Sequence, residues 1–319
     1  MSTTKEYPDA SVISKIFNAP ISDCCVTVIR QGYFGNSYKL TDGRSVYFAR
    51  TSPPDDYLCL FYEKQMMHQE PDLHSIILDK TDIPVPKVLF YDWSRRLIDK
   101  DIIVMEYLPG ETLDKKSSSF SLNEYNNCLS QLGGYIRKLH AITGNKHGYI
   151  GPHKPMIPQD TWRKAFCIMW EKLVKDCRDC GGYSKEQAEF VLSVFQKLTD
   201  VIPDNISASL MHMDIWSTNI LTDRKGNITG LIDFDRACWG DPELDLAIAQ
   251  YCGLLKSSFC DGYGVNTNQV FESEIRQKLY MLYEHQKYIV ICMSQRRNNP
   301  SGAKMYANQS LSILKRLSI

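Results

Sequence analysis

The sequence has no surplus of charge of either sign and no long hydrophobic run. Its 319 residues carry 37 Lys plus Arg against 37 Asp plus Glu, so the formal net charge is zero. Balanced charge gives no electrostatic reason to expect nucleic acid or an anionic membrane as a partner. Apolar segments such as YIVICM are far shorter than the ~20 residues of a membrane-spanning helix. We therefore expect neither nucleic acid nor a membrane as a partner.

A secretory signal and a complete zinc motif are also missing. The opening segment, MSTTKEYPDASVIS, is polar and has no apolar signal core. The eleven cysteines are scattered along the chain, so we expect free thiols rather than disulfides. Cys177 and Cys180 form a lone C-x-x-C pair, whereas a structural zinc site needs a second pair of ligands. These absences favour a cytoplasmic protein without structural zinc.

The first hundred residues have the pattern of a small mixed lobe. CVTVIR and SVYFAR are rich in β-forming residues, and the D-G pair before the second segment predicts a hairpin. A loop with two glycines, QGYFGNS, follows the first strand. The other expected elements are a helix over 58–69 that carries Glu63 and strands over 83–92 and 101–108.

After Pro109-Gly110 the apolar spacing becomes mainly helical. Ser121 and Glu124 form a capping-box pair at the start of the first long helix. The expected helices cover 121–142, 160–174, 184–198, 244–250 and 274–293, with short strands over 209–214, 219–223 and 228–233. The sequence thus predicts an α+β chain, with one lobe over 1–108 and a larger, mainly helical lobe over 109–319.

The short strands carry the residues with the clearest chemistry. Asp214 ends one extended run, Asn219 follows five residues later, and Asp233 ends a separate strand. A hairpin between these strands brings their ends together, so an amide oxygen and a carboxylate can share one Mg²⁺. Asp214 then remains as a candidate base. This is the set of groups that phosphoryl transfer requires, with one Asp for the accepting hydroxyl and an Asn and an Asp for the metal.

The motif H-x-D-x-x-x-x-N, formed by His212, Asp214 and Asn219, is followed by IDFD and WGDPELDLA. This series resembles the aminoglycoside phosphotransferase (APH-like) family of small-molecule kinases. RQGYFGNSYKL resembles the phosphate-covering loop, FYEKQMM the regulatory helix with its glutamate, and IIVMEYLPGETL the hinge. The resemblance implies a bilobal protein-kinase-like α+β fold, with ATP or GTP as co-substrate and Mg²⁺ as the metal.

The resemblance also implies roles for single residues in the catalytic loop, 210–247. Asp214 corresponds to the catalytic base, and Asn219 and Asp233 correspond to the metal ligands. His212 corresponds to a histidine that braces the loop, and Asp245 to a buried aspartate that holds the loop's backbone.

Nucleotide binding is implied for a second set of residues in the smaller lobe, 1–108. These are Gly32, Gly35, Asn36 and Ser37 in the loop, Arg50 and Glu63 around the phosphates, and Glu106 and Leu108 in the hinge. The family usually has Lys where this chain has Arg50. Arg keeps the charge and can bind phosphate and Glu63 as a fork, but its reach differs. An exposed strand-end charge is the alternative interpretation of Arg50.

The acceptor is expected to be a small hydroxylated molecule. Only residues 234–244 separate Asp233 from Asp245, which leaves little room for a peptide-binding segment and argues against a protein substrate. Region 145–205 and the C-terminal helices are expected to build the pocket. A polycationic aminoglycoside would need an acidic pocket. The acids available there are Glu272, Glu274 and Glu284, which equally fit a solvated helix face.

Several functions therefore stay open at this point. An aminoglycoside-like antibiotic and a hydroxylated metabolite are both compatible acceptors. A catalytically silent nucleotide-binding protein with a kinase fold is suggested by Arg50. A metallohydrolase that uses the carboxylates directly would leave the glycine loop and the hinge unexplained.

Overall fold

The computed structural model describes residues 7–29 and 35–318. Its smaller lobe is built on an antiparallel sheet with the strand order β1-β2-β3-β5-β4. The strands are β1 (Cys25–Ile29), β2 (Asn36–Thr41), β3 (Val46–Thr51), β4 (Val88–Asp92) and β5 (Ile102–Glu106). The expected D-G hairpin joins β2 to β3, with Gly43 at a φ of 84° that favours glycine.

One face of this sheet packs against helix α1 (Ala10–Phe17), which the hydrophobic pattern did not lead us to expect. Tyr38, Leu40 and Ala49 are buried on that face. The ring of Phe17 stacks on the ring of Tyr47 with centroids 4.0 Å apart. The sheet thereby acquires the second layer that an amphipathic sheet needs.

The helix expected over 58–69 is displaced along the chain. Residues 61–65 form turns, Met66–Gln69 is a short 3₁₀ helix, and α2 covers Glu70–Lys80. Gln65 has a φ of 58°, which no right-handed helix can include. Pro71 lies in the first turn of α2, where its missing N–H costs nothing. Glu63 is consequently outside the helix.

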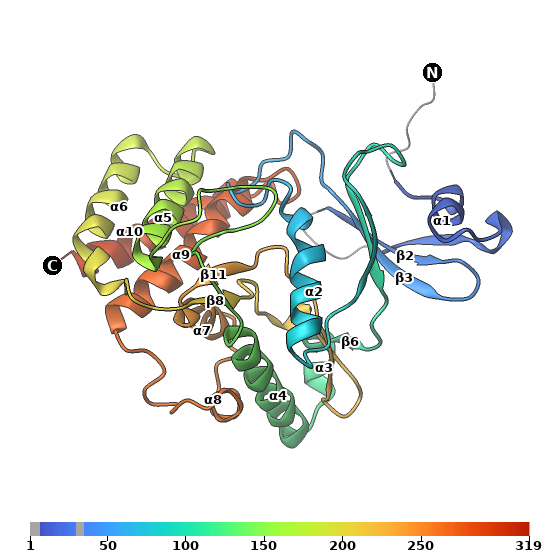
Figure 1. Ribbon diagram of the computed structural model, residues 1–319. Helices are drawn as coiled ribbons and strands as arrows, with labels where there is room; N and C mark the ends of the chain where they lie inside the picture. The colour runs from blue at the N-terminus through green and yellow to red at the C-terminus, as the bar shows by residue number, and fades with distance from the viewer. Residues whose placement is uncertain (1–6, 30–34, 319) are drawn as a thin grey trace.

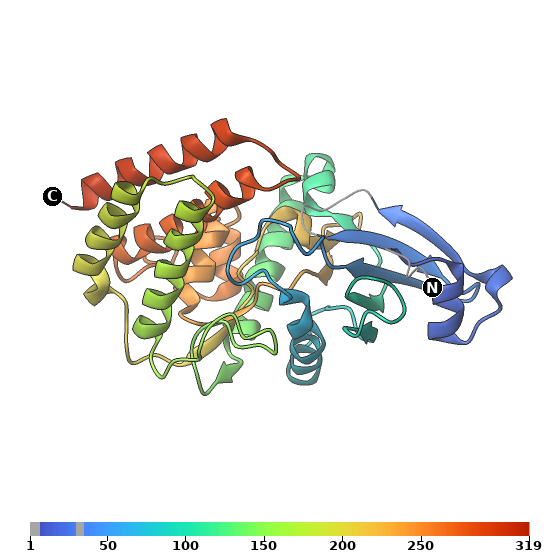
Figure 2. The same ribbon diagram turned by 90° about the horizontal axis from the view of Figure 1, so that it is seen from above.

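Helices dominate the larger lobe. They are α3 (Leu113–Lys116), α4 (Leu122–His140), α5 (Trp162–Asp179), α6 (Lys185–Leu198), α7 (Pro242–Tyr251), α8 (Ser257–Tyr263), α9 (Glu274–Met293) and α10 (Pro300–Leu317). The capping box of Ser121 and Glu124 is present at the start of α4. Helices α8 and α10 were not expected. Figure 2 shows the C-terminal helix in red at the end of the molecule opposite the blue sheet.

Two small sheets lie between the five-stranded sheet and the outer helices (Figure 1). One has the order β10-β9-β6, from β6 (Glu111–Thr112), β9 (Ile220–Thr222) and β10 (Ile228–Leu231). The other has the order β11-β8-β7, from β7 (Thr143–Gly144), β8 (Ala208–Met211) and β11 (Cys238–Gly240). The expected bilobal α+β fold is confirmed, while the division at residue 108 stays a prediction.

Two further observations concern the cysteines and the helices of the described chain. All eleven cysteines are free. Within 7–29 and 35–318, no helix has the length and apolar character needed to cross a membrane.

Candidate active site

Asp214 and Asn219 meet in the segment that joins β8 to β9. The side-chain Nδ2 of Asn219 donates to the backbone oxygen of Asp214 at 3.0 Å and to its Oδ2 at 2.9 Å. These contacts use the amide nitrogen, so the amide oxygen of Asn219 is left to face a cation. The carboxylate of Asp214 keeps 21% of its surface exposed, which makes it reachable from solvent.

Asp245 on α7 lies fully buried behind this segment. Its carboxylate accepts the backbone N–H of His212 at 2.6 Å and that of Met213 at 2.8 Å. The Nε2 of His140 lies 3.1 Å from the same carboxylate. Met213 has a φ of 66°, a conformation that few residues with side chains adopt, so the two bonds hold a strained turn. Asp245 thus contacts the backbone that the resemblance assigns to it, while the bracing roles of His212 and Asp245 stay predictions.

Two cations contact the carboxylate of Asp214. Nη1 of Arg236 forms an ion pair with its Oδ1, and Nζ of Lys287 lies 3.5 Å from the same oxygen. Burial alone raises the pKa of Asp214, but the charges of Arg236 and Lys287 outweigh it and lower the pKa to about 2. Sequence reasoning missed both cations. Arg236 follows the IDFD motif directly, whereas Lys287 comes from distant α9 without any local signal.

Asp233 follows β10 with a φ of 72°. The neighbouring Ile232 N–H donates to the backbone oxygen of Asn219 at 3.1 Å, so the hairpin holds the two predicted metal ligands side by side. Carboxylate oxygens of Glu70, Asp233 and Asp235 also lie within 4.8 Å of one another. Burial and the charge of Asp233 raise the pKa of Asp235 well above its usual range. The amide and carboxylate oxygens present suit Mg²⁺, a hard cation.

Arg50 lies beside these carboxylates and links the smaller lobe to the larger one. Its Nη2 is 2.5 Å from Oε2 of Glu70, and its Nη1 contacts Asp233 and lies 3.3 Å from Asp235. Its side chain is 13% exposed, so Arg50 is not a solvated strand-end charge. The acidic residue of the helix that pairs with Arg50 is Glu70, at the start of α2.

The expected pairing of Arg50 with Glu63 is therefore wrong. Oε2 of Glu63 accepts the backbone N–H of Leu60 at 2.7 Å, within its own turn. Burial raises the pKa of Glu63. The displacement of α2 explains the error, because it moves the helical acidic position seven residues along the chain. The first-turn signal of Pro71 in EPDLH would have located Glu70.

The glycine loop is described from Gly35 onward, and Gly32 lies outside the described residues. Gly35 has a φ of 65°, and a Cβ there would lie 2.2 Å from the backbone oxygen of Thr51. Asn36 pairs with Thr51 and Ser37 pairs with Arg50 across β2 and β3. The end of the loop therefore lies against the strand that carries Arg50.

The two predicted hinge residues lie at the end of β5 and just beyond it. Glu106 ends β5, and its backbone N–H donates to the oxygen of Lys87 at 3.0 Å. Leu108 packs close to Gly230 of β10, the strand that leads into Asp233. The hinge therefore borders the strand that carries a predicted metal ligand.

Comparisons with known proteins identify the family. The model of the phosphotransferase enzyme family, APH, matches residues 26–272. A probable ketoamine kinase of Vibrio parahaemolyticus serotype O3:K6 is 24% identical over 258 residues, which are 79% of this chain and 81% of that protein.

Solved structures share the fold at low sequence identity. A thermostable mutant of aminoglycoside phosphotransferase APH(4)-Ia, in a ternary complex with AMP-PNP and hygromycin B, superimposes with a TM-score of 0.65. It is 17% identical, over 96% of this chain and 97% of that one. A putative fructosamine-3-kinase from Haemophilus somnus 129PT gives a TM-score of 0.61 at 18% identity, over 94% and 96%. The chain therefore belongs to the phosphotransferase enzyme family, with the aminoglycoside phosphotransferase-like fold, and it is a small-molecule kinase.

Proposed function

We propose that this kinase moves the γ-phosphate of ATP or GTP to a hydroxyl of a small molecule, with Asp214 as the base. The observation that carries the proposal is the direct hydrogen bond from Asn219 to Asp214, next to the backbone hydrogen bond by which Ile232, the neighbour of Asp233, binds Asn219. A base and two oxygen ligands are thereby gathered within one loop and one hairpin. Positioning and charge neutralisation are what phosphoryl transfer asks of a protein.

Each residue has a distinct task in the proposed reaction. Asn219 and Asp233 would hold Mg²⁺, which supplies positive charge to the phosphates. Arg50 contributes a guanidinium at the same place, with Glu70 fixing its orientation. Asp214 accepts the hydrogen bond of the acceptor hydroxyl and takes its proton. Because the pKa of Asp214 is about 2, it orients the hydroxyl first and receives the proton only as the new P–O bond forms.

For the acceptor, we propose a hydroxylated metabolite rather than an antibiotic, with ketoamines as the first class to test. The family relatives named as probable ketoamine kinases cover about four-fifths of this chain, which supports that choice. Aminoglycosides stay the alternative, because the solved structures with this fold include one that holds hygromycin B. AMP-PNP in the same structure supports ATP as the first nucleotide to test. A nucleotide-dependent metabolite kinase would work in the cytoplasm.

The experiment is a screen of ketoamines, other hydroxylated metabolites and aminoglycosides with release of nucleoside diphosphate as the readout. Asp214→Ala should abolish acceptor-dependent release while calorimetry shows that nucleotide still binds. The matched control is Asp261→Ala, an exposed acid on α8, which should retain wild-type rates. Near-wild-type rates in Asp214→Ala would show that the base is misassigned.

The two other functions predict different results. A catalytically silent protein would bind nucleotide and release no diphosphate with any acceptor. A metallohydrolase would cleave esters without added nucleotide.

A further inference from the structure

Building on the proposed phosphotransfer, we infer that the acceptor carries no surplus positive charge, and that Arg236 and Lys287 impose this selection. The charges around Asp214 are the physical basis of this selection. Two cations alternate there with two carboxylates, in a network that comes from three separate parts of the chain. Both carboxylates of the network are paired with these cations, so the network offers no further negative charge to a polycation.

The contacts within the network are direct. Lys287 forms an ion pair with Glu284 one turn earlier on α9 and lies 3.5 Å from Oδ1 of Asp214. Arg236 forms an ion pair with Asp214, and its Nη2 lies 3.4 Å from Oε2 of Glu284. Arg236, Lys287 and Glu284 are 6%, 5% and 1% exposed, so water screens their charges poorly. Each carboxylate in the network already contacts both cations.

Burial makes this balance important for an incoming ligand. The acceptor hydroxyl must approach the exposed edge of Asp214, and any ammonium group next to that hydroxyl comes close to Arg236 and Lys287. Like charges placed together in a poorly solvated site repel each other strongly. A neutral polyol meets no such repulsion, and a zwitterion offsets it when its carboxylate faces the two cations.

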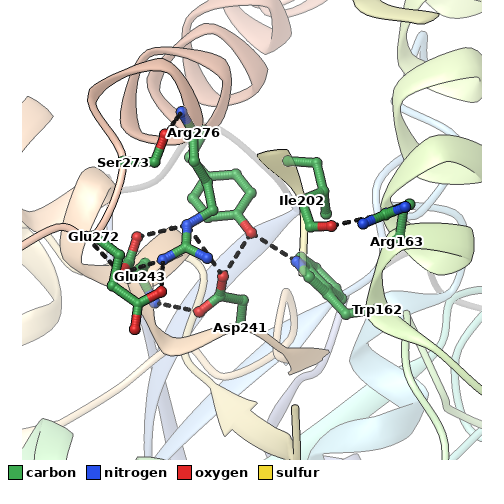
Figure 3. Close-up of polar contacts among 9 residues, drawn as sticks. Trp162, Arg163, Ile202, Asp241, Glu243, Glu272, Ser273 and Arg276 are labelled. Atoms are coloured by element: carbon green, nitrogen blue, oxygen red, sulfur yellow. Dashed lines mark hydrogen bonds and ion pairs between the residues drawn. The ribbon is translucent and has the colours of Figure 1, made fainter. Parts of the chain in front are cut away.

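The other acids considered for an acidic pocket are also engaged. Glu272 lies 2.9 Å from Nη2 of Arg276, which also binds Glu243 at 2.5 Å (Figure 3). Glu274 lies 2.6 Å from Nζ of Lys278 on the exposed side of α9. Glu272 and Glu274, which were candidates for an acidic pocket, therefore form ion pairs with cations of the chain itself.

Two buried polar side chains of the network and its surroundings, those of Arg236 and Tyr62, add no negative charge. The guanidinium of Arg236 lies over the ring of Tyr62, with 5.3 Å between its carbon and the ring centroid. Among the described residues, Nε of Arg236 and the hydroxyl of Tyr62 have no hydrogen-bond partner. Burial raises the pKa of Glu63, another carboxyl near the network. Arg236 and Tyr62 therefore add hydrogen-bond donors beside Asp214, while the carboxylates of Asp233 and Asp235 contact Arg50.

The test compares two acceptors with the same sugar hydroxyls and different charge. One is a glycated amino acid with a free carboxylate, which is net neutral, and the other is its carboxamide, which carries one positive charge. We expect wild-type kcat/KM to be at least ~10-fold higher for the neutral acceptor, because both acceptors carry the ammonium group and only the neutral one has a carboxylate that can face Arg236 and Lys287 and offset the repulsion. Lys287→Gln should reduce this ratio to about threefold or less, with the KM for nucleotide unchanged.

Two control variants separate selection from folding. Lys287→Arg keeps the positive charge and should keep most of the wild-type ratio. Lys278→Gln removes a cation from the exposed side of the same helix and should leave the ratio unchanged. Thermal unfolding of each variant shows whether it is folded, and the ratio of two acceptors on one enzyme preparation cancels any loss of active protein.

Three results would each contradict a different part of the inference. A wild-type preference for the carboxamide, or for a polycationic aminoglycoside in the same assay, overturns the inference while the phosphotransfer stands. An unchanged ratio in folded Lys287→Gln overturns the role of Lys287. If no acceptor of either charge class stimulates release of nucleoside diphosphate, the proposed phosphotransfer itself fails, and the inference fails with it.

Discussion

The guanidinium of Arg50 joins Glu70 at the start of α2 to Asp233 at the end of β10. Its Nη2 lies 2.5 Å from Oε2 of Glu70, while its Nη1 contacts the carboxylate of Asp233. One side chain on β3 thereby connects the smaller lobe with a predicted metal ligand of the larger one. The fork lets two separate nitrogens make these contacts, one with each carboxylate, which gives a physical use for Arg where the family usually has Lys.

Replacement of Glu70 should weaken nucleotide binding. Glu70→Gln removes the charge that orients Arg50, and we expect the KM for nucleotide to rise about tenfold, the usual scale for a lost charged hydrogen bond. Glu63→Gln is the matched control, because Glu63 contacts Leu60 rather than Arg50. Steady-state kinetics with varied nucleotide measures both. A larger effect of Glu63→Gln would return the phosphate-site role to Glu63.

Gly35→Ala should damage the nucleotide site through a steric conflict. The new Cβ would lie 2.2 Å from the backbone oxygen of Thr51, at a φ of 65°. Because backbone atoms must move, we expect the affinity for nucleotide to fall by at least ~10-fold. Gly181→Ala is the control, with a φ of 79° and nothing within 4 Å of the new Cβ. It should cost roughly 1 kcal/mol of stability and leave nucleotide binding, measured by calorimetry, unchanged.

Asp245→Asn should destabilise the protein and impair turnover together. The carboxylate accepts two backbone N–H groups in a fully buried place, and an amide would direct an NH₂ group at one of these donors. We expect the free energy of unfolding in urea to fall by about 2–4 kcal/mol. Asp261→Asn on the exposed side of α8 should change it by less than ~0.5 kcal/mol. Equal effects of the two variants would refute a bracing role for Asp245.

Asp176 on α5 predicts a dependence of stability on pH. Its carboxylate accepts the backbone N–H of Phe61 at 2.7 Å, and burial raises its pKa to about 6. Since the ordinary pKa is 3.8, the folded chain binds more protons than the unfolded chain between these values, and stability falls as pH rises through that window. Above pH 6 the ionised carboxylate is a net cost.

Asp176→Asn keeps an accepting oxygen without the charge. We expect it to raise the free energy of unfolding at pH 7.5 by about 1 kcal/mol, after allowance for the partial exposure of this side chain. At pH 3.5 the gain should vanish, because the wild-type carboxyl is then protonated. Urea unfolding at the two pH values checks this, with Asp179→Asn as the control. The same gain at both values would mean that charge is not the cause.

Residues close together in the sequence were largely predictable. The spacing of His212, Asp214 and Asn219 lies within one loop, and the hairpin to Asp233 has a turn signal of its own, so local rules were sufficient. Glu70 was missed because FYEKQMM has a helical composition, while the outcome depended on one positive φ at Gln65 and on Pro71. Local backbone geometry decided that case.

By itself, the sequence determined the family and the α+β fold and predicted the residues of the catalytic loop, because these depend on short spacings and on periodic hydrophobic patterns. Only the tertiary structure decided which charges meet. Lys287 reaches Asp214 from α9, and Arg50 contacts Glu70 rather than Glu63. Glu272 before α9 binds Arg276, and Glu274 in its first turn binds Lys278. The physical reason is that an ion pair depends on distance and burial, and residues that are remote in the sequence acquire both only when the helices pack.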